Sequence, residues 1–150
     1  MRVIFLDVDG VLNHDSSMEL TKDYWTKPEP YLIQKLKKIV DKTDAKLVLS
    51  SDWRLDRDDE EEDFHYFTLV RMLYEYDMGL WDFTPFLGNV SRGTEISEYL
   101  SEHEDEIESF VILDDRCDME PVKDRLVRTD HSVGLTDEDV LEAINMLLDN

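Results

Sequence analysis

The sequence has only one cysteine, Cys117, and lacks any apolar run long enough to cross a bilayer. With a single cysteine no disulfide can form within the chain, so a reducing compartment is the expected setting. A membrane-spanning helix needs about 20 predominantly apolar residues. The layout of a signal peptide, a basic start followed by an apolar centre, is also missing. We therefore expect a cytoplasmic protein that does not associate with membranes.

Basic residues are scarce, with 16 Lys and Arg against 37 Asp and Glu and a formal net charge of −21. A field of this sign repels polyanions unless basic side chains gather at one place. The charge argues against a broad grip on nucleic acids. It leaves room for a site that takes one terminal phosphate with the help of a metal ion.

The 150 residues also lack internal repeats, low-complexity tracts and a linker, and 41% of them are hydrophobic. This length and composition predict one globular domain, residues 1–150, with a core of its own. Apolar, β-branched segments alternate with segments of helical period. We expect strands at 2–8, 45–50, 80–84, 110–113 and 126–129, and helices at 31–41, 64–76, 91–102 and from 137 onward. This alternation predicts an α/β domain with a mainly parallel sheet and helices on both faces.

Two further local expectations follow from the pattern. Residues 10–30 show no clear period and are predicted to form a loop or short hairpin over the end of the first strand. Thr136 is expected to cap the last helix. The apolar stripe predicted for that helix is Val140, Leu141, Ile144, Leu147 and Leu148.

Polar side chains follow three of the predicted strands. They are Asp7 with Asp9, Ser50 with Ser51, and Asp114 with Asp115. In an open parallel sheet, ligands bind outside the carboxyl ends of the strands. Several adjacent carboxylates cannot all stay ionised without neutralisation, and a hard divalent cation with oxygen ligands, such as Mg²⁺, supplies it. The serine hydroxyls and Arg92 would then donate to a bound oxyanion.

Four segments resemble, in the same order, the motifs of the haloacid dehalogenase (HAD) superfamily. They are Asp7-Val8-Asp9-Gly10-Val11-Leu12, Val48-Leu49-Ser50, Arg92 before a helix, and Ile112-Leu113-Asp114-Asp115. Five short segments resemble, more narrowly, the small HAD domain of Swiss-army-knife RNA repair proteins. They are Ser50-Ser51-Asp52-Trp53-Arg54, Arg92-Gly93-Thr94-Glu95-Ile96, Asp118-Met119, Thr129-Asp130 and Gly134-Leu135-Thr136. The resemblance spans essentially the whole chain and implies a three-layer, Rossmann-like HAD fold.

The resemblance also implies the catalytic roles. Asp7 would be the nucleophile that attacks phosphorus and forms an aspartyl-phosphate. Asp9 would protonate the leaving oxygen and then activate water. Ser50, or its neighbour Ser51, would hydrogen-bond the phosphoryl oxygens, and Arg92 would stabilise their charge. An acid at position 9 favours phosphatase chemistry, because the dehalogenases of the superfamily lack it.

The same resemblance implies a Mg²⁺ site and positions that contact the substrate. The metal ligands would be Asp7, the backbone carbonyl of Asp9, Asp114 and Asp115, with the division between the last two left open. Gly10 and Ser51 are the implied substrate-binding positions. Arg54 would either contact the substrate or form a surface ion pair.

The stretches that would carry a cap domain, residues 10–45 and 52–91, are too short for a full one. The helix at 64–76 would form a partial lid or pack on the sheet. An open site suits a bulky phosphorylated substrate, such as a nucleic-acid end or a protein, or a small one enclosed by oligomerisation. The predicted function is a Mg²⁺-dependent phosphatase acting on a nucleotide, a nucleic-acid end or a small phosphomonoester.

Two other classes of function stay open at this point. One is a catalytically inactive HAD-fold protein that binds a partner and keeps the acids for metal or fold. The other is a receiver-type signalling domain, which the order of the acids along the chain disfavours.

Overall fold

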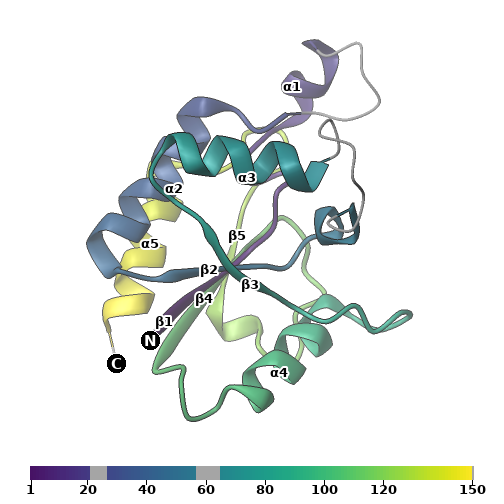
Figure 1. Ribbon diagram of the computed structural model, residues 1–150, viewed down its shortest axis with the longest axis vertical. Coiled ribbons are helices and arrows are strands. Elements are labelled where there is room, and N and C mark those ends of the chain that lie inside the picture. Colours follow the sequence, from purple (N-terminus) through teal and green to yellow (C-terminus); the bar gives the residue numbers. More distant parts are fainter. Residues whose placement is uncertain (21–26, 57–64, 150) are drawn as a thin grey trace.

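The computed structural model describes residues 1–20, 27–56 and 65–149, and these form an α/β fold around one parallel sheet (Figure 1). The elements are β1 (Arg2–Leu6), α1 (Asp15–Leu20), α2 (Pro30–Thr43), β2 (Lys46–Leu49), the 3₁₀ helix η1 (Asp52–Asp56), α3 (His65–Glu75), β3 (Leu80–Phe83), α4 (Arg92–Glu102), β4 (Ser109–Asp114), the 3₁₀ helix η2 (Lys123–Arg125), β5 (Leu126–Arg128) and α5 (Asp137–Leu148). The five strands lie in the order β3-β2-β1-β4-β5. Every neighbouring pair is parallel.

The central strand β1 is buried on both faces, as expected of a strand flanked by parallel neighbours in a covered sheet. Ile4 and Leu6 pack into a core on one face, whereas Val3 and Phe5 pack on the other. Side chains alternate between faces along a strand, so the run Val3–Leu6 supplies both cores at once. This explains why β1 is almost continuously apolar.

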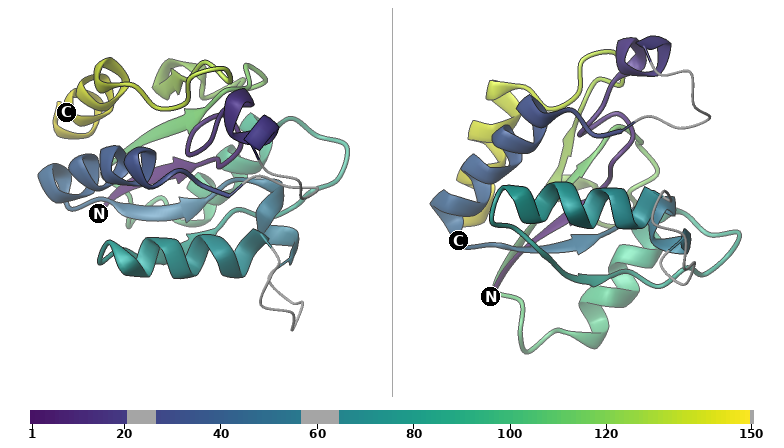
Figure 2. Two further views of the ribbon diagram at one scale, coloured as in Figure 1. Left: turned by 90° about the horizontal axis from the view of Figure 1, so that it is seen from above. Right: turned by 45° about the horizontal axis from the view of Figure 1, so that its top comes forward.

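Helices cover both faces of the sheet, with α2, α3 and α5 on one side and α4 on the other (Figures 1 and 2). The larger core takes Leu36 of α2, Leu69 of α3 and Ala143 of α5 against β1, β2, β4 and β5. On the opposite face Ile96 and Tyr99 of α4 pack against Val3, Phe5, Val48 and Ile112. The prediction of an α/β, three-layer architecture is confirmed.

Some local expectations need correction. Within the predicted loop at 10–30 the chain forms α1, so that stretch is neither wholly a loop nor a hairpin. Thr136 does cap α5, since its side chain accepts a hydrogen bond from the Asp139 backbone N–H. However, Leu141 and Leu148 lie exposed, while Ala143 is buried in their place. The predicted stripe was too wide because α5 contacts the sheet along a narrower face.

Between β2 and β3, and between β1 and α2, the described residues contain α3, η1 and α1 and no cap domain. Leu69 and Leu73 of α3 lie in the core, so this helix packs on the sheet rather than standing over the strand ends as a lid. Within the described part of the chain, no helix is both long and apolar enough to cross a membrane.

Candidate active site

The carboxyl ends of the three middle strands bring the predicted residues together. The Asp7 backbone N–H donates to Leu113 O (3.0 Å) and the Ser50 N–H donates to Leu6 O (2.8 Å), so both residues extend the strand ladder by one step. Asp114 is the last residue of β4. Because β2, β1 and β4 are neighbours, Asp7, Ser50 and Asp114 end at the same edge of the sheet.

Asp7, Asp114 and Asp115 form an acidic cluster in which one carboxylate oxygen from each lies within 4.8 Å of the others. Asp7 and Asp114 are buried, and Asp115 is half-buried. Burial, and next the negative charge of Asp114, raise the pKa of Asp7 well above its ordinary value. Burial also raises the pKa of Asp114, although Arg92 opposes the shift. Three oxygen donors with an excess of negative charge fit a hard divalent cation such as Mg²⁺.

Gly10 gives Asp115 its place in this cluster. Its backbone has φ +82°, and a Cβ at this position would lie 2.4 Å from Asp115 Oδ2. A glycine is therefore required twice, for the left-handed conformation and for the close approach of the carboxylate. The Thr129 hydroxyl donates to the Gly10 carbonyl (2.7 Å), which fixes the loop from the β5 side.

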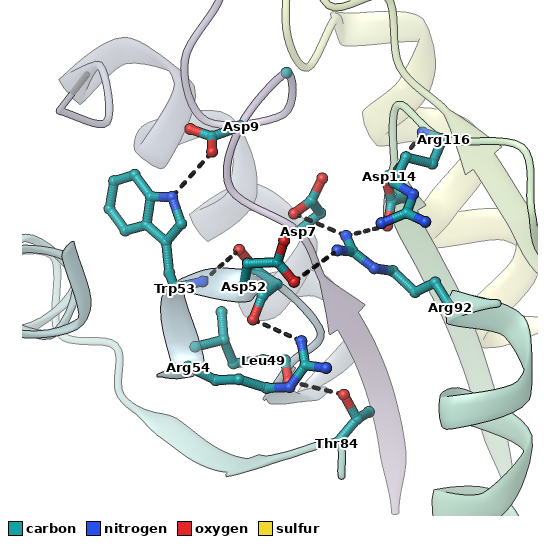
Figure 3. Close-up of polar contacts among 12 residues, drawn as sticks. Asp7, Asp9, Leu49, Asp52, Trp53, Arg54, Thr84, Arg92, Asp114 and Arg116 are labelled. Atoms are coloured by element: carbon teal, nitrogen blue, oxygen red, sulfur yellow. Dashed lines mark hydrogen bonds and ion pairs between the residues drawn. The ribbon is translucent and has the colours of Figure 1, made fainter. Parts of the chain in front are cut away.

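Arg92 neutralises part of the cluster (Figure 3). Its Nη1 lies 3.1 Å from Asp7 Oδ1 and 3.0 Å from Asp114 Oδ2, and its Nη2 lies 3.6 Å from Asp52 Oδ1. Burial alone would lower the pKa of Arg92, but Asp7 and Asp114 outweigh it and the pKa is raised. This guanidinium stays charged and joins the ends of β1 and β4.

The start of α4 is built to hold Arg92 at this point. Ser91 caps the helix by accepting a hydrogen bond from the Thr94 N–H (3.1 Å). The carboxylate of Asp118 accepts from the Arg92 backbone N–H (3.1 Å). A Cβ on Gly93 would lie 2.5 Å from the carbonyl oxygen of Glu120, so the glycine lets the helix approach the loop after β4. Asp118, in the loop after β4, thus anchors the first residue of α4 through a hydrogen bond.

The two serines after β2 have different surroundings. Ser50 is buried, and among the residues that the structure describes its Oγ has no hydrogen-bond partner. The Oγ of Ser51 accepts from the Trp53 backbone N–H (3.2 Å). A buried hydroxyl without a partner is costly unless a ligand or water satisfies it, so Ser50 has an O–H to offer an oxyanion. Ser51 only accepts in its contact with Trp53, so its O–H can donate as well, and Ser51 lines the cleft at the strand ends.

Asp9 lies two residues after Asp7, but its carboxylate is exposed and outside the acidic cluster. Its Oδ1 accepts from Asn13 Nδ2 (2.9 Å), and its Oδ2 accepts from Trp53 Nε1 (3.0 Å). Asn13 also accepts from the Gly10 backbone N–H (2.9 Å) through its side-chain oxygen. The loop after β1 therefore turns Asp9 toward η1, while Asp7 faces β4 (Figure 3).

The family comparison agrees with this arrangement. The model of the family described as "HAD domain in Swiss Army Knife RNA repair proteins" matches residues 3–140. The chain belongs to this HAD-domain family. The searches of curated proteins and of solved structures returned no match. The match runs from Val3 in β1 through the first turn of α5, so it includes four whole strands, all of β1 but Arg2, and every side chain of the acidic cluster.

In this HAD domain Arg54 is buried, so its ion pair is not the surface pair that was one of the two expectations. The side chain is 1% exposed and its Nη2 lies 2.9 Å from Glu95 Oε1. Its Nη1 donates to the Ser51 carbonyl (2.6 Å), and Glu95 Oε2 accepts from the Leu87 N–H (2.9 Å). Arg54 therefore links the segment after β2, through Ser51, to α4, through Glu95.

A cleft of about 230 Å³ opens over the strand ends of the HAD domain. It is lined by Asp7, Asp9, Ser51, Asp52, Arg92, Asp115 and Arg116. Sequence reasoning missed Asp52 and Arg116. Arg116 lies at the mouth, where its guanidinium donates to both oxygens of Asp118 (2.9 and 2.7 Å). The sequence signal that could have found it is its position two residues after Asp114, since the loop that follows an acidic strand end also shapes the mouth of a site.

Proposed function

We propose that this HAD domain is a Mg²⁺-dependent phosphatase that hydrolyses a phosphomonoester through an aspartyl-phosphate on Asp7. The observation that carries the proposal is the buried carboxylate of Asp7. It lies 3.1 Å from Arg92 Nη1 and in one cluster with Asp114 and Asp115. Phosphoryl transfer depends chiefly on positioning and on charge neutralisation, and this site places a carboxyl nucleophile beside a fixed cation.

Each residue has a role that its place supports. Asp7 attacks phosphorus. Asp9, at the mouth of the cleft, gives a proton to the leaving oxygen and later takes one from the attacking water. Ser50 Oγ, buried and without a partner among the described residues, donates to a phosphoryl oxygen. Arg92 stays charged and stabilises the phosphoryl oxygens as their charge shifts.

Asp7, Asp114 and Asp115 are the side chains that would hold the metal ion, together with the backbone carbonyl of Asp9. A bound Mg²⁺ would supply positive charge to the transferring phosphoryl group. Ser51, which lines the cleft, and Gly10, whose lack of a side chain leaves room for the Asp115 carboxylate, would lie against the substrate.

The substrate we propose is a nucleotide or a phosphorylated nucleic-acid end. The family description names RNA repair proteins, and the described residues contain no cap domain to restrict substrate size. We further propose that residues 1–150 act as one catalytic domain, consistent with a family match over 3–140.

The experiment measures phosphate release, with and without Mg²⁺, from an aryl phosphate, nucleotides, sugar phosphates, and oligonucleotides phosphorylated at the 3′ or 5′ end. We expect Mg²⁺-dependent release by the wild-type protein and its loss in Asp7→Asn. The matched control is Asp44→Asn, which removes one acid at the end of α2, where the left-handed backbone (φ 55°) suits asparagine. Activity that survives in Asp7→Asn would contradict the mechanism.

A further inference from the structure

Asp9 is an exposed carboxylate whose two oxygens are nevertheless both held by buried side chains. Asn13 and Trp53 are 2% and 3% exposed. Each donates one N–H, Asn13 to Oδ1 and Trp53 to Oδ2 (Figure 3). An exposed acid normally samples several rotamers. Two donors from fixed groups restrict this one to a single orientation.

The two donors differ in origin. Asn13 belongs to the same loop as Asp9, four residues further on, so its hydrogen bond stays within that loop. Trp53 comes from η1, which follows the neighbouring strand β2. The hydrogen bond from its Nε1–H therefore links Asp9 to the segment that follows β2.

Trp53 is itself held firmly. Its ring stacks on His65 of α3, with centroids 4.6 Å apart and planes 29° from parallel. Its backbone N–H donates to Ser51 Oγ (3.2 Å), and its side chain is part of the larger core. A rigid, buried indole can therefore set the direction of a carboxylate that solvent would otherwise leave free.

We propose that Trp53 is a positioning residue, whose indole N–H holds the Asp9 carboxylate at the cleft for proton transfer to the leaving group. The inference rests on the proposed phosphatase function. Each carboxylate oxygen has two lone pairs, so one donated N–H per oxygen leaves a lone pair free to carry the proton. The indole N–H cannot accept the proton itself, because it is a donor only.

The two chemical steps define what Trp53 supports. In the first, a bond forms between Asp7 Oδ and phosphorus, the bond from phosphorus to the substrate oxygen breaks, and Asp9 gives its proton to that oxygen. In the second, water oxygen bonds to phosphorus, the bond to Asp7 breaks, and a proton from water returns to Asp9. The first step needs Asp9 only when the leaving oxygen is a poor leaving group.

The test uses this dependence on the leaving group in single-turnover reactions with Mg²⁺, which isolate the first step. Trp53→Phe keeps an aromatic ring that can stack on His65 and removes the N–H together with the rest of the indole's five-membered ring. We expect release of the alcohol from a simple alkyl phosphate to fall about tenfold, part of the 10²- to 10⁴-fold effect of a positioned proton donor. Release of 4-nitrophenol, which leaves without a proton, should change less than about twofold.

The matched control is Trp81→Phe on β3, where the tryptophan is exposed and lies beside Lys46, and we expect it to match wild type with both substrates. An equal loss with both substrates in Trp53→Phe would show a purely structural role and overturn the inference. So would a Trp53→Phe protein indistinguishable from wild type.

A readout without activity separates this inference from the proposed function. In ¹H–¹⁵N spectra the indole signal lost in Trp53→Phe is assigned to Trp53, and that signal should shift in Asp9→Ala but not in Asp44→Asn. An indole signal unmoved by Asp9→Ala would overturn the inference whatever the activity. A shifted signal in a protein that hydrolyses none of the phosphomonoesters would instead overturn the phosphatase proposal, and the role of Trp53 in proton transfer would fall with it.

Discussion

Asp7, Asp114, Asp115 and Arg92 form a partly buried group of three carboxylates and one guanidinium, in which Arg92 pairs with Asp7 and Asp114. Burial makes the uncompensated charge costly, which is why the pKa of Asp7 and that of Asp114 are both raised. A divalent cation in this group would remove that cost. Metal binding and proton binding would therefore compete for the same oxygens.

This competition sets a pH dependence. A carboxyl whose folded-state pKa is raised favours the protonated form in the fold. The stability it contributes is present below the ordinary pKa of 3.8 and is lost as pH rises through the raised value. Between the ordinary pKa and the raised pKa of Asp7, we expect the free energy of unfolding of the metal-free protein to fall as pH rises. We expect the stabilisation by Mg²⁺ to grow with pH. Thermal unfolding from acidic to neutral pH, with Mg²⁺ or with chelator, measures both. A Mg²⁺ effect that shrinks as pH rises would contradict it.

The close approach of Gly10 to Asp115 predicts the effect of adding a single methyl group at position 10. Gly10→Ala places a Cβ 2.4 Å from Asp115 Oδ2 and forces alanine into a backbone with φ +82°. We expect the free energy of unfolding to fall by at least about 1–2 kcal/mol and Mg²⁺ to stabilise the variant less than it stabilises wild type. Chemical denaturation with and without Mg²⁺ is the measurement.

Gly88→Ala is the matched control, because Gly88 has the same φ of +82° and a Cβ added there would meet no neighbouring atom within 4 Å. It should share the backbone strain and keep the full response to Mg²⁺. If both variants respond to Mg²⁺ as wild type does, the close approach of Gly10 and Asp115 has no part in metal binding.

At the scale of elements, the buried Arg54–Glu95 pair joins η1 to α4, and the Leu87 N–H brings in the loop between β3 and α4. Glu95 lies one helical turn after Arg92, so the pair fixes the helix that carries the cation of the site. A buried ion pair adds little over an apolar contact, but removing one partner leaves a costly unpaired charge.

We therefore predict that Glu95→Ala lowers the free energy of unfolding by about 3–5 kcal/mol. Glu98→Ala, at an exposed position on the same helix, should change it by less than about 0.5 kcal/mol. Denaturant unfolding of the two variants gives the comparison. Equal, small effects would show that Arg54 does not depend on Glu95 for its burial.

At the scale of the whole molecule, the net charge of −21 opposes the approach of a nucleic-acid substrate. Added salt screens this repulsion, since the Debye length falls to about 8 Å at physiological ionic strength. At fixed Mg²⁺, we expect kcat/KM for a phosphorylated oligonucleotide to rise with monovalent salt, by up to about tenfold. The value for a small aryl phosphate should change less. A fall with salt, typical of proteins that neutralise several phosphates, would contradict this expectation.

The sequence predicted the sheet and its polar edge because parallel strands that end in acids place those acids together. Asp7, Ser50 and Asp114 follow this rule directly. The burial of Arg54 was not predictable, because it depends on a partner 41 residues away on another element. The contact from Trp53 to Asp9 joins residues 44 apart, and no local pattern reports it.

The most direct test of the central claim is to look for the phosphoryl group on Asp7. Wild-type protein is mixed with an aryl phosphate and Mg²⁺, quenched in acid during turnover, and examined by mass spectrometry of the intact chain and its peptides. We predict one added phosphoryl group, on the peptide that contains Asp7, and none in Asp7→Asn. Hydrolysis of the substrate with no phosphorylated Asp7 at any quench time would contradict the account.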